Sequence, residues 1–346
     1  MEEESACEPL PILNKEIFET DALLAVQHLS YDIDKKSILK DLSFEIEGEG
    51  ITAVLGANGS GKSTLLRLLA GFLEPTQGKI FFEGESVLGP NQKLVAGHEE
   101  IALVRQDNRL FPLHTVKENL NHILRDEFEE VKTHKIEQLS ELLGLKHNLN
   151  RVLKFLSGGE QQRVAIAAAL ASNPKLLLMD EPFSQTDMYL KQELKGYLVE
   201  IVNQLKIHIL FVSHEPQDAL ALANNILILS DGKLIESGQP KDLYYRPKTK
   251  VGAMLTGVCN WLPINVLKEK NHNLHQIGDE ILVRSDQIQI FKKLTSDSWA
   301  SEVIKLEFCG FFQSVFLKSE ELKTTFLVTQ PTNLLFEKGQ KVWVKL

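Results

Sequence analysis

The sequence predicts an α/β domain built on a mainly parallel sheet, with a small all-β domain after it. Between residues 23 and 245, short apolar runs alternate with stretches of helical spacing, which is the pattern of parallel strands joined by helices. Between residues 246 and 346 the runs are short, rich in β-forming residues and separated by turns, as in a small barrel or sandwich. Residues 1–22 are acidic, show no clear period and form an N-terminal extension.

The composition narrows the class of protein. Of the 346 residues, 43% are hydrophobic, which is enough for a large core. The 38 Lys and Arg residues against 47 Asp and Glu residues leave a net charge of −9, whereas a general nucleic-acid binder carries a basic face. Cys7, Cys259 and Cys309 lie far apart and form no C-x-x-C pair. We therefore expect a reducing cytosol, with neither a disulfide framework nor a zinc site.

Membrane-spanning and export signals are not found in the sequence. No stretch approaches the roughly 18 apolar residues that indicate a membrane span. The first four residues, Met1-Glu2-Glu3-Glu4, are acidic where a signal peptide would be basic. We expect a soluble protein that is not exported, so that any membrane role comes through a partner.

Individual elements follow from the apolar runs. Four runs in the main domain predict strands buried on both faces of the sheet, namely Ile51–Leu55, Leu176–Met179, Ile209–Val212 and Ile226–Leu229. A helical insert is expected over residues 108–160, because Val116–Leu124 and Ile136–Leu145 have helical spacing. The β-rich domain is expected to contain strands at Ile281–Arg284, Ile288–Phe291, Phe326–Val328 and Lys341–Leu346.

The sharpest motif is a glycine-rich loop between a predicted strand and a predicted helix. The pattern G-x-x-x-x-G-K-[ST] is matched by Gly56, Ala57, Asn58, Gly59, Ser60, Gly61, Lys62, Ser63 and Thr64. Glycines let several backbone N–H groups point at one centre, and the helix N-terminus adds partial positive charge there. Lys62 supplies a full charge to the β- and γ-phosphates, and the Ser63 hydroxyl can ligate Mg²⁺. A chance glycine-rich turn would lack the flanking strand and helix, so the motif predicts a nucleotide site.

A second motif, Ser157-Gly158-Gly159-Glu160, precedes an Ala-rich helical run at Val164–Ala171. Ser157 and Glu160 alone form the capping-box pattern that begins many ordinary helices. A cap needs no Gly-Gly pair, which costs backbone entropy. Two glycines at a helix start are useful where backbone N–H groups approach an anion closely. The motif therefore indicates a second anion contact.

A third motif ends the next apolar strand with Asp180-Glu181-Pro182. In a protein with a phosphate loop, an acid at the end of such a strand is placed to hold Mg²⁺. Glu181 follows it and can polarise the attacking water. Two acids standing alone at a strand end would indicate only a loop, so this interpretation depends on the first motif.

In this order the three motifs resemble the nucleotide-binding domain of ABC ATPases, a P-loop NTPase fold, over residues 23–245. Lys62 and Ser63 match its Walker A loop, Ser157-Gly158-Gly159 its signature motif and Asp180 its Walker B aspartate. The resemblance implies an ATPase that uses ATP and Mg²⁺. That family holds two ATP molecules between two domains, and this chain carries one set of motifs, so a homodimer is implied.

The resemblance also implies roles for single residues. Gln106 matches the glutamine that touches Mg²⁺ and water, and His214 matches the switch histidine that contacts the γ-phosphate. Tyr31 precedes the phosphate loop at a distance suited to the aromatic ring that stacks on adenine. Asp187 matches the last residue of the family's Ser-Ala-Leu-Asp loop at the dimer interface. Gln185-Thr186 replaces the Ala-Leu pair of that loop, so we expect the dimer contacts to differ in detail.

The join to the β-rich domain is similar to that of bacterial importer ATPases of the maltose, polyamine, ferric-iron and sulfate/molybdate groups. The likeness lies in Arg246-Pro247, in Gly257–Pro263 and in Val283–Asp286, where Ser and Asp replace the group's Pro and Glu. It implies an OB-like or TOBE-like C-terminal domain, integral-membrane permease subunits docked on the helical insert, and a periplasmic or lipid-anchored solute-binding protein reached through them. It also implies a peripheral location on the cytoplasmic face of the inner membrane. Polyamine or ferric iron is the solute expected by analogy alone.

Two other functions stay open. A soluble ABC protein of translation or DNA maintenance usually carries two cassettes on one chain or a long coiled coil, and the sequence contains neither. An exporter ATPase usually lacks a β-rich tail of this kind. We therefore expect an importer ATPase with no nucleic-acid partner, and a permease that co-purifies from a detergent extract would support this expectation.

Overall fold

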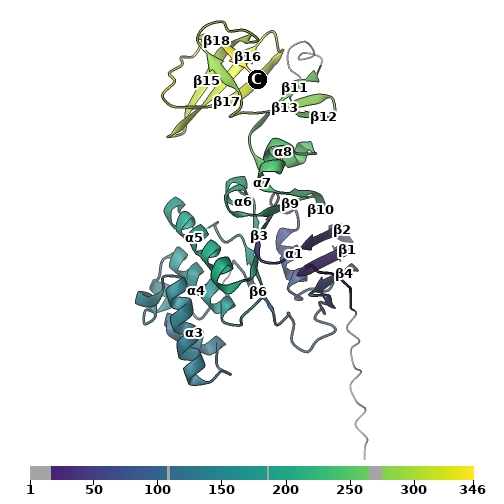
Figure 1. The fold of residues 1–346 in the computed structure, drawn as a ribbon, viewed down its shortest axis with the longest axis vertical. Helices are drawn as coiled ribbons and strands as arrows, with labels where there is room; N and C mark the ends of the chain where they lie inside the picture. Colours follow the sequence, from purple (N-terminus) through teal and green to yellow (C-terminus); the bar gives the residue numbers. More distant parts are fainter. Residues whose placement is uncertain (1–16, 107–109, 185–186, 265–274) are drawn as a thin grey trace, which may run out of the picture. The chain divides into compact units, whose positions relative to one another are not determined.

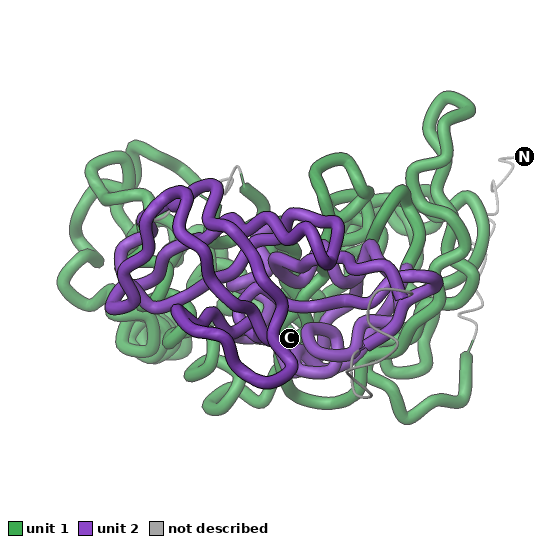
Figure 2. The backbone as a smooth tube through the Cα atoms, turned by 90° about the horizontal axis from the view of Figure 1, so that it is seen from above, with its two compact units in different colours: residues 1–214, 229–234 green, residues 215–228, 235–346 purple. Residues whose placement is uncertain are grey.

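The computed structural model describes residues 17–106, 110–184, 187–264 and 275–346 (Figure 1). Cys7 and the Gln185-Thr186 pair of the sequence analysis lie outside these residues. The chain forms two compact units, residues 1–214 with 229–234 and residues 215–228 with 235–346 (Figure 2). None of the helices in the described part of the chain combines the length and the apolar content that a membrane span needs.

The parallel sheet of the first unit confirms the predicted α/β core. Its strands β3, β8, β7 and β6 lie side by side in that order and all run parallel. Their bounds are Gly50–Leu55 for β3, His208–Ser213 for β8, Leu176–Asp180 for β7 and Ile101–Val104 for β6. Every residue of β3 and β8 is buried, which explains why both strands appear in the sequence as unbroken apolar runs.

A second sheet in this unit is antiparallel, and the sequence analysis did not predict it. It has the order β2-β1-β4-β5, with β1 at Leu24–Ile33, β2 at Lys36–Ile46, β4 at Gln77–Phe82 and β5 at Glu85–Ser86. Register shifts interrupt the pairing of β1 with β2. Each shift breaks the strict alternation of apolar and polar residues, so these strands lack the period-two signal that would reveal them.

Helices cover the parallel strands. Their bounds are Lys62–Leu69 for α1, Val116–Ile123 for α2, Glu129–Leu142 for α3, Gly158–Leu170 for α4 and Met188–Leu205 for α5, with short 3₁₀ turns η1 at Lys146–Asn148 and η2 at Leu153–Phe155. α1 packs against β7, α4 against β6 and α5 against β8. In Figure 1, α3, α4 and α5 lie on one side of β3 and β6, and α1 lies on the other.

The predicted helical insert is confirmed by α2, α3 and the start of α4, but α3 ends three residues before the predicted Leu145. Gly144 adopts a left-handed φ of 64° and the N–H of Leu145 donates to the carbonyl of Ser140, which closes the helix.

The second unit contains the predicted all-β region. One sheet has the order β11-β13-β12 and another the order β14-β18-β15-β16-β17, and all of their pairings are antiparallel. The bounds are Cys259–Pro263, His275–Ile277, Glu280–Arg284, Gln289–Phe291, Trp299–Phe308, Phe312–Ser319, Thr324–Pro331 and Lys341–Lys345 for β11 to β18. The four strands predicted here are confirmed, and their inward side chains share one core with Trp299, Val315 and Val342.

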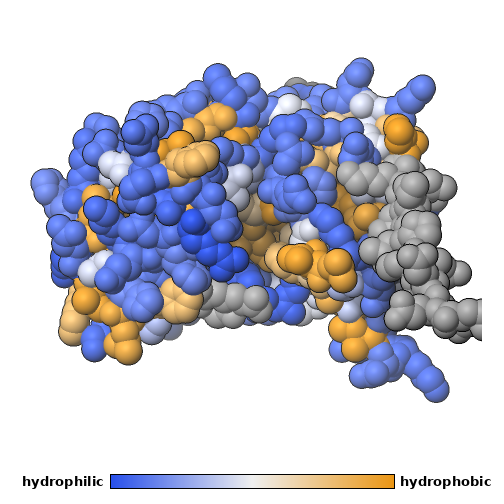
Figure 3. Space-filling model, turned by 90° about the horizontal axis from the view of Figure 1, so that it is seen from below, coloured by the Kyte–Doolittle hydropathy of each residue, from blue (hydrophilic) through white to orange (hydrophobic). Residues whose placement is uncertain are grey.

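The remaining elements connect these parts of the chain. They are α6 at Pro216–Leu222, β9 at Asn225–Ser230, β10 at Lys233–Gly238, α7 at Pro240–Tyr245 and α8 at Lys250–Thr256. On the face of the molecule seen in Figure 3, hydrophilic side chains predominate and hydrophobic ones form small separate patches.

The two cysteines in the described residues, Cys259 and Cys309, are free thiols.

Candidate functional site

One edge of the parallel sheet collects site residues from distant parts of the sequence. Leu55 at the end of β3 lies beside Ser213 at the end of β8, and β7 pairs with β8 up to Asp180. Because these strands are parallel, the phosphate loop, the Asp180-Glu181 pair and His214 all follow the same edge. Open α/β sheets bind their ligands at this carboxyl edge.

The phosphate loop, residues 56–64, runs from the end of β3 into the first turn of α1. Gly61 is the N-cap residue of α1, with a φ of 103°, and no side chain caps the helix. A Cβ at Gly61 would lie 2.6 Å from Cδ2 of Leu39, so the loop packs too tightly there for a side chain. The first N–H groups of α1 therefore remain available to an anion, together with the positive end of the helix dipole.

Two polar side chains inside the loop fit a phosphate ligand. The Lys62 ammonium donates to the carbonyls of Gly56 and Ala57 at 2.8 and 3.0 Å. Burial lowers the pKa of Lys62, while the charges of Glu181 and Asp180 act to raise it. The hydroxyl of Ser60 is buried, and the described residues offer it no hydrogen-bond partner. Buried hydroxyls are rarely left without a hydrogen-bond partner, so an oxygen-rich ligand at this loop would supply an acceptor for the Ser60 hydroxyl.

A hydroxyl and a carboxylate meet between the loop and β7. Ser63 donates to Oδ1 of Asp180 across 2.9 Å. Burial, followed by the charge of Glu181, raises the pKa of Asp180, although the bond from Ser63 opposes that shift. Two hard oxygen donors of this kind fit Mg²⁺, which takes few protein ligands and fills its other positions with phosphates and water.

Glu181 is held in a strained backbone conformation. Its φ is 49°, and its carbonyl accepts hydrogen bonds from both the N–H and the hydroxyl of Ser184, at 3.2 and 3.0 Å. Oε1 of Glu181 lies 3.2 Å from Nδ1 of His214. Left-handed backbone at a residue other than glycine costs free energy and gathers at functional sites. In this conformation the Glu181 side chain faces His214, the residue that the family resemblance implies beside the γ-phosphate.

The positions of Tyr31 and Gln106 follow from the pairing of the strands that carry or precede them. Tyr31 on β1 pairs with Leu39 on β2, the residue that packs on Gly61. Gln106 is exposed two residues beyond β6, and β6 pairs with β7 in parallel as far as Val104. The structure therefore brings both predicted residues to the neighbourhood of the loop and of the carboxyl edge.

The signature segment begins α4, in the helical part of the unit. Ser157 Oγ accepts from the N–H of Glu160, and the Glu160 carboxylate accepts from the N–H of Ser157, so the capping box is complete. Gly158 is exposed, whereas a Cβ on buried Gly159 would lie 3.1 Å from the Leu190 side chain. Close packing of α4 against α5 is thus a second reason for glycine at position 159.

Asp187 has a local structural role. Its Oδ1 accepts a hydrogen bond from the N–H of Leu190 at 3.0 Å and so caps α5. This bond fixes the carboxylate at the start of the helix that packs on Gly159, next to the signature segment.

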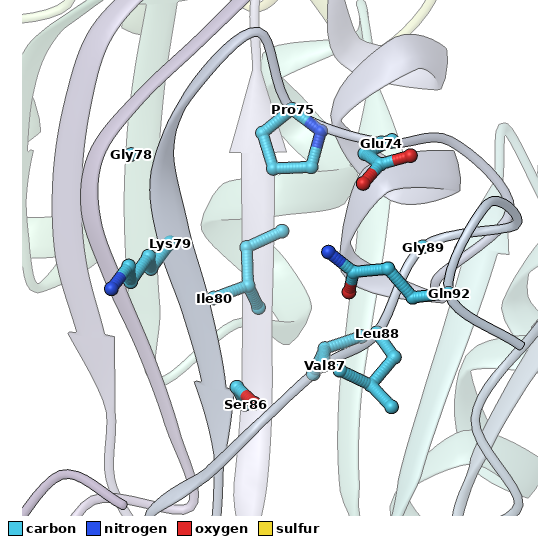
Figure 4. A pocket seen from close by; sticks show the side chains of 10 residues that line it. All are labelled: Glu74, Pro75, Gly78, Lys79, Ile80, Ser86, Val87, Leu88, Gly89 and Gln92. Carbon is cyan, nitrogen blue, oxygen red and sulfur yellow. The ribbon is translucent and has the colours of Figure 1, made fainter. Parts of the chain in front are cut away.

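Two cavities in the first unit were not predicted. One, of about 250 Å³, involves none of the predicted site residues; its lining is Glu74, Pro75, Gly78, Lys79, Ile80, Ser86, Val87, Leu88, Gly89 and Gln92. Figure 4 shows Ile80 and Gln92 pointing toward each other across it and Lys79 pointing away. The other, of about 840 Å³, is mainly apolar and is lined by Phe72 and residues 91–99. Neither segment carries a motif, so only the fold reveals them.

Comparisons with known proteins show the family to which the chain belongs. The family model for the ABC transporter matches residues 39–184. The Fe(3+) ions import ATP-binding protein FbpC 2 of Haemophilus influenzae is 33% identical over 320 residues, which cover 88% of this chain and 89% of that protein. The Fe(3+) ions import ATP-binding protein FbpC of Yersinia pestis is 30% identical over 310 residues, covering 85% and 88%.

Solved structures share the fold of about two thirds of the chain. CbiO1 from Clostridium perfringens, part of the ABC transporter complex cbiONQ, has a TM-score of 0.60 and 29% identity over 65% of this chain and 91% of that one. The ADP conformation of MJ1267, an ATP-binding cassette of an ABC transporter, has a TM-score of 0.60 and 24% identity over 68% and 98%.

The fold and the carboxyl-edge site thus define a nucleotide-binding ATPase of the P-loop class. Within that class, the chain belongs to the ATP-binding proteins of the ABC transporter family. The predicted family, fold and ATPase activity are confirmed.

Proposed function

We propose that this chain hydrolyses ATP to drive the uptake of ferric iron through a separate membrane permease. The observation that carries the proposal is the single sheet edge at which Lys62, Asp180, Glu181 and His214 meet. Import is favoured over export, and ferric iron over other solutes, because relatives named for Fe(3+) import align over most of this chain, the β-rich region included.

Each residue at the edge has a distinct task in the proposed reaction. The loop N–H groups and Lys62 hold the phosphates, and Ser63 and Asp180, with Gln106 nearby, would hold Mg²⁺. The bound ion would supply charge neutralisation on the β- and γ-phosphates. Glu181 orients water and accepts its proton, and His214 holds the Glu181 carboxylate at one oxygen. Tyr31 stacks on the adenine.

The working unit is proposed to be a homodimer on the cytoplasmic face of the cell membrane. The signature residues Ser157, Gly158 and Gly159 of one copy would contact the ATP held by the other copy's phosphate loop, with Asp187 at the interface. The first N–H groups of α4 support this role, since a helix N-terminus attracts anions and exposed Gly158 leaves its backbone accessible. A solute-binding protein would deliver iron to the permease.

The permease is proposed to dock in the apolar cavity of about 840 Å³ beside Phe72, which lies outside the helical insert on which the family resemblance would place it. Leu94 is fully exposed and Val95 is 77% exposed. Exposed apolar residues that cluster in one groove favour a protein partner. Replacing both by Asp should leave the ATPase activity of the purified chain unchanged and abolish co-purification of the permease. The matched control is Leu335→Asp, at a leucine of the second unit that is 76% exposed.

Purification of the tagged chain from a detergent extract tests the function. A multi-span membrane protein should co-purify, and ATP hydrolysis by the reconstituted complex should rise with ferric-loaded binding protein. Stimulation by a polyamine-loaded protein in its place would change the solute and keep the importer. Ribosomes or nucleic acid in the eluate, without a membrane protein, would contradict the proposal.

A further inference from the structure

Two helices of the first unit begin with the same capping box. At α2, Thr115 Oγ1 accepts from the N–H of Glu118, whose carboxylate accepts from the N–H and hydroxyl of Thr115. At α4, Ser157 and Glu160 exchange the equivalent bonds at 3.3 and 2.8 Å. Within the described residues, the hydrogen bonds to the Glu118 carboxylate all come from Thr115. A capping box of this chain therefore needs no third residue.

The box at α4 nevertheless has further partners. Nδ2 of Asn148, on the η1 turn, donates to Oε1 of Glu160 at 2.7 Å. Nη1 of Arg151 lies 3.7 Å from the same oxygen, and its Nη2 donates to the carbonyl of Phe155. Asn148 is buried, with only 8% of its surface exposed, whereas Arg151 is exposed. A carboxylate only accepts, so the buried amide must present its NH₂ group to Glu160.

The electrostatics explain why these extra partners matter at α4. Partial burial acts to raise the pKa of Glu160, but hydrogen bonds from Ser157 and Asn148 and the charge of Arg151 lower it overall. Glu160 is therefore ionised at neutral pH, in the first turn of the helix proposed to receive a phosphate. A carboxylate free to swing toward that N-terminus would repel the phosphate and compete for its N–H groups.

We propose that Asn148 is a positioning residue for the ATPase reaction, assisted by Arg151. It holds Oε1 of Glu160 while Oε2 accepts from the N–H of Ser157, so that the carboxylate cannot swing and Gly158 stays open to the γ-phosphate. The inference rests on the proposed function, in which this segment contacts the ATP of a second copy. Asn148 itself touches no nucleotide.

An exchange of isosteric side chains tests this role. Asn148→Asp places two carboxylates face to face, so turnover should fall about ten- to a hundredfold, the scale for misplaced catalytic contacts. Nucleotide affinity should not change, because the chain's own phosphate loop is untouched. Adding Glu160→Gln should restore turnover to within about threefold, since the new amide at position 160 donates to the new carboxylate at position 148 while its oxygen still accepts from Ser157.

The controls separate positioning from folding. Glu118→Gln at the matched box of α2 should leave turnover unchanged, and all variants should keep their melting temperature within a few degrees. Amide hydrogen exchange at residues 158–161 gives a readout that needs no hydrolysis. Exchange should be faster in N148D and normal in the double variant.

Two outcomes would overturn the inference. One is wild-type turnover and exchange in N148D, and the other is a defect that E160Q does not repair. A wild-type chain that fails to hydrolyse ATP with its partners would instead contradict the proposed function, and the exchange measurement would still decide the role of Asn148.

Discussion

The Ser63 hydroxyl on α1 donates to Oδ1 of Asp180 at the end of β7, with 2.9 Å between the two oxygens. This bond joins two residues that are 117 positions apart in the sequence. It fixes a pair of oxygen donors at the place where the loop N–H groups and the Lys62 ammonium converge.

Asp180→Asn should therefore separate nucleotide binding from magnesium use. The amide keeps the size of the side chain and can still accept from Ser63, but it lacks the charge that draws a divalent cation. Turnover should fall by at least about a hundredfold, and the Mg²⁺ concentration for half-maximal activity should rise. Titration of ATPase activity with Mg²⁺ measures both, with exposed Asp126→Asn as control. An unchanged titration curve would remove Asp180 from the metal site.

Glu181→Gln should retain ATP and lose hydrolysis. The neutral amide still contacts His214 but cannot accept a proton from water, so the rate should fall by roughly 10²–10⁴, the usual contribution of a general base. Equilibrium binding of a fluorescent ATP analogue should be unaffected. Exposed Glu200→Gln on α5 serves as the control for an equal change of charge. Normal turnover in E181Q would assign the base to another residue.

Acid should weaken the first unit through His208. This side chain is buried on β8, with Nδ1 donating to the carbonyl of Gly48 and Nε2 accepting from Thr52. Burial lowers its pKa below the usual value. At a pH below the pKa that His208 has in the unfolded chain, the unfolded state binds a proton at His208 and the folded state does not. The free energy of unfolding should therefore fall with falling pH, by at most about 1.4 kcal/mol per pH unit.

The measurement for His208 is thermal unfolding followed by circular dichroism between pH 7 and pH 5. His208→Gln should flatten the dependence, whereas exposed His147→Gln should leave it as in the wild type. Equal slopes for wild type and H208Q would exclude His208 as the cause.

Loss of the Arg284 side chain should weaken the second unit. It is 1% exposed and donates to the carbonyls of Tyr244, Ala253 and Gly257 and to the hydroxyl of Thr256. These acceptors lie at the ends of α7 and α8, where helix carbonyls lack partners of their own. Arg284→Met should lower the free energy of unfolding by roughly 3 kcal/mol or more, because several acceptors stay buried and unpaired.

Tryptophan fluorescence reports this effect directly. Trp261, Trp299 and Trp343 are the three tryptophans of the chain, and all belong to the second unit. Urea unfolding of R284M should shift to lower denaturant, while exposed Arg246→Met should not shift it. Coincident curves would mean that the helix ends find other donors.

The sheet edge could be predicted from sequence because each of its parts has a strong local signal. Ile51–Leu55 and Ile209–Val212 are unbroken apolar runs, and the residues that follow them, among them Lys62 and His214, carry the family motifs. The domain boundaries at residues 22 and 245 remain predictions. The antiparallel sheet was not predicted, because register shifts between β1 and β2 interrupt the alternation of apolar and polar residues along these strands.

The support of Glu160 could not have been predicted for a different reason. Asn148 belongs to no motif, and an asparagine in a polar stretch normally indicates only a turn. Its contact with Glu160 depends on where η1 packs against the start of α4, which is a property of tertiary structure. The strand order of the β-rich region, with β18 between β14 and β15, is likewise set by backbone pairing that any sequence can make.

The parallel strands have a consequence for synthesis. β3 is flanked in space by β8, which is made more than 150 residues later, so a nascent chain has the phosphate loop long before it has this parallel neighbour of β3. At the usual 5–20 residues per second, roughly eight to thirty seconds separate the two strands. ATP capture on the ribosome should thus begin abruptly, once β8 has emerged from the exit tunnel, and nucleotide binding would time the pairing of β3 with β8.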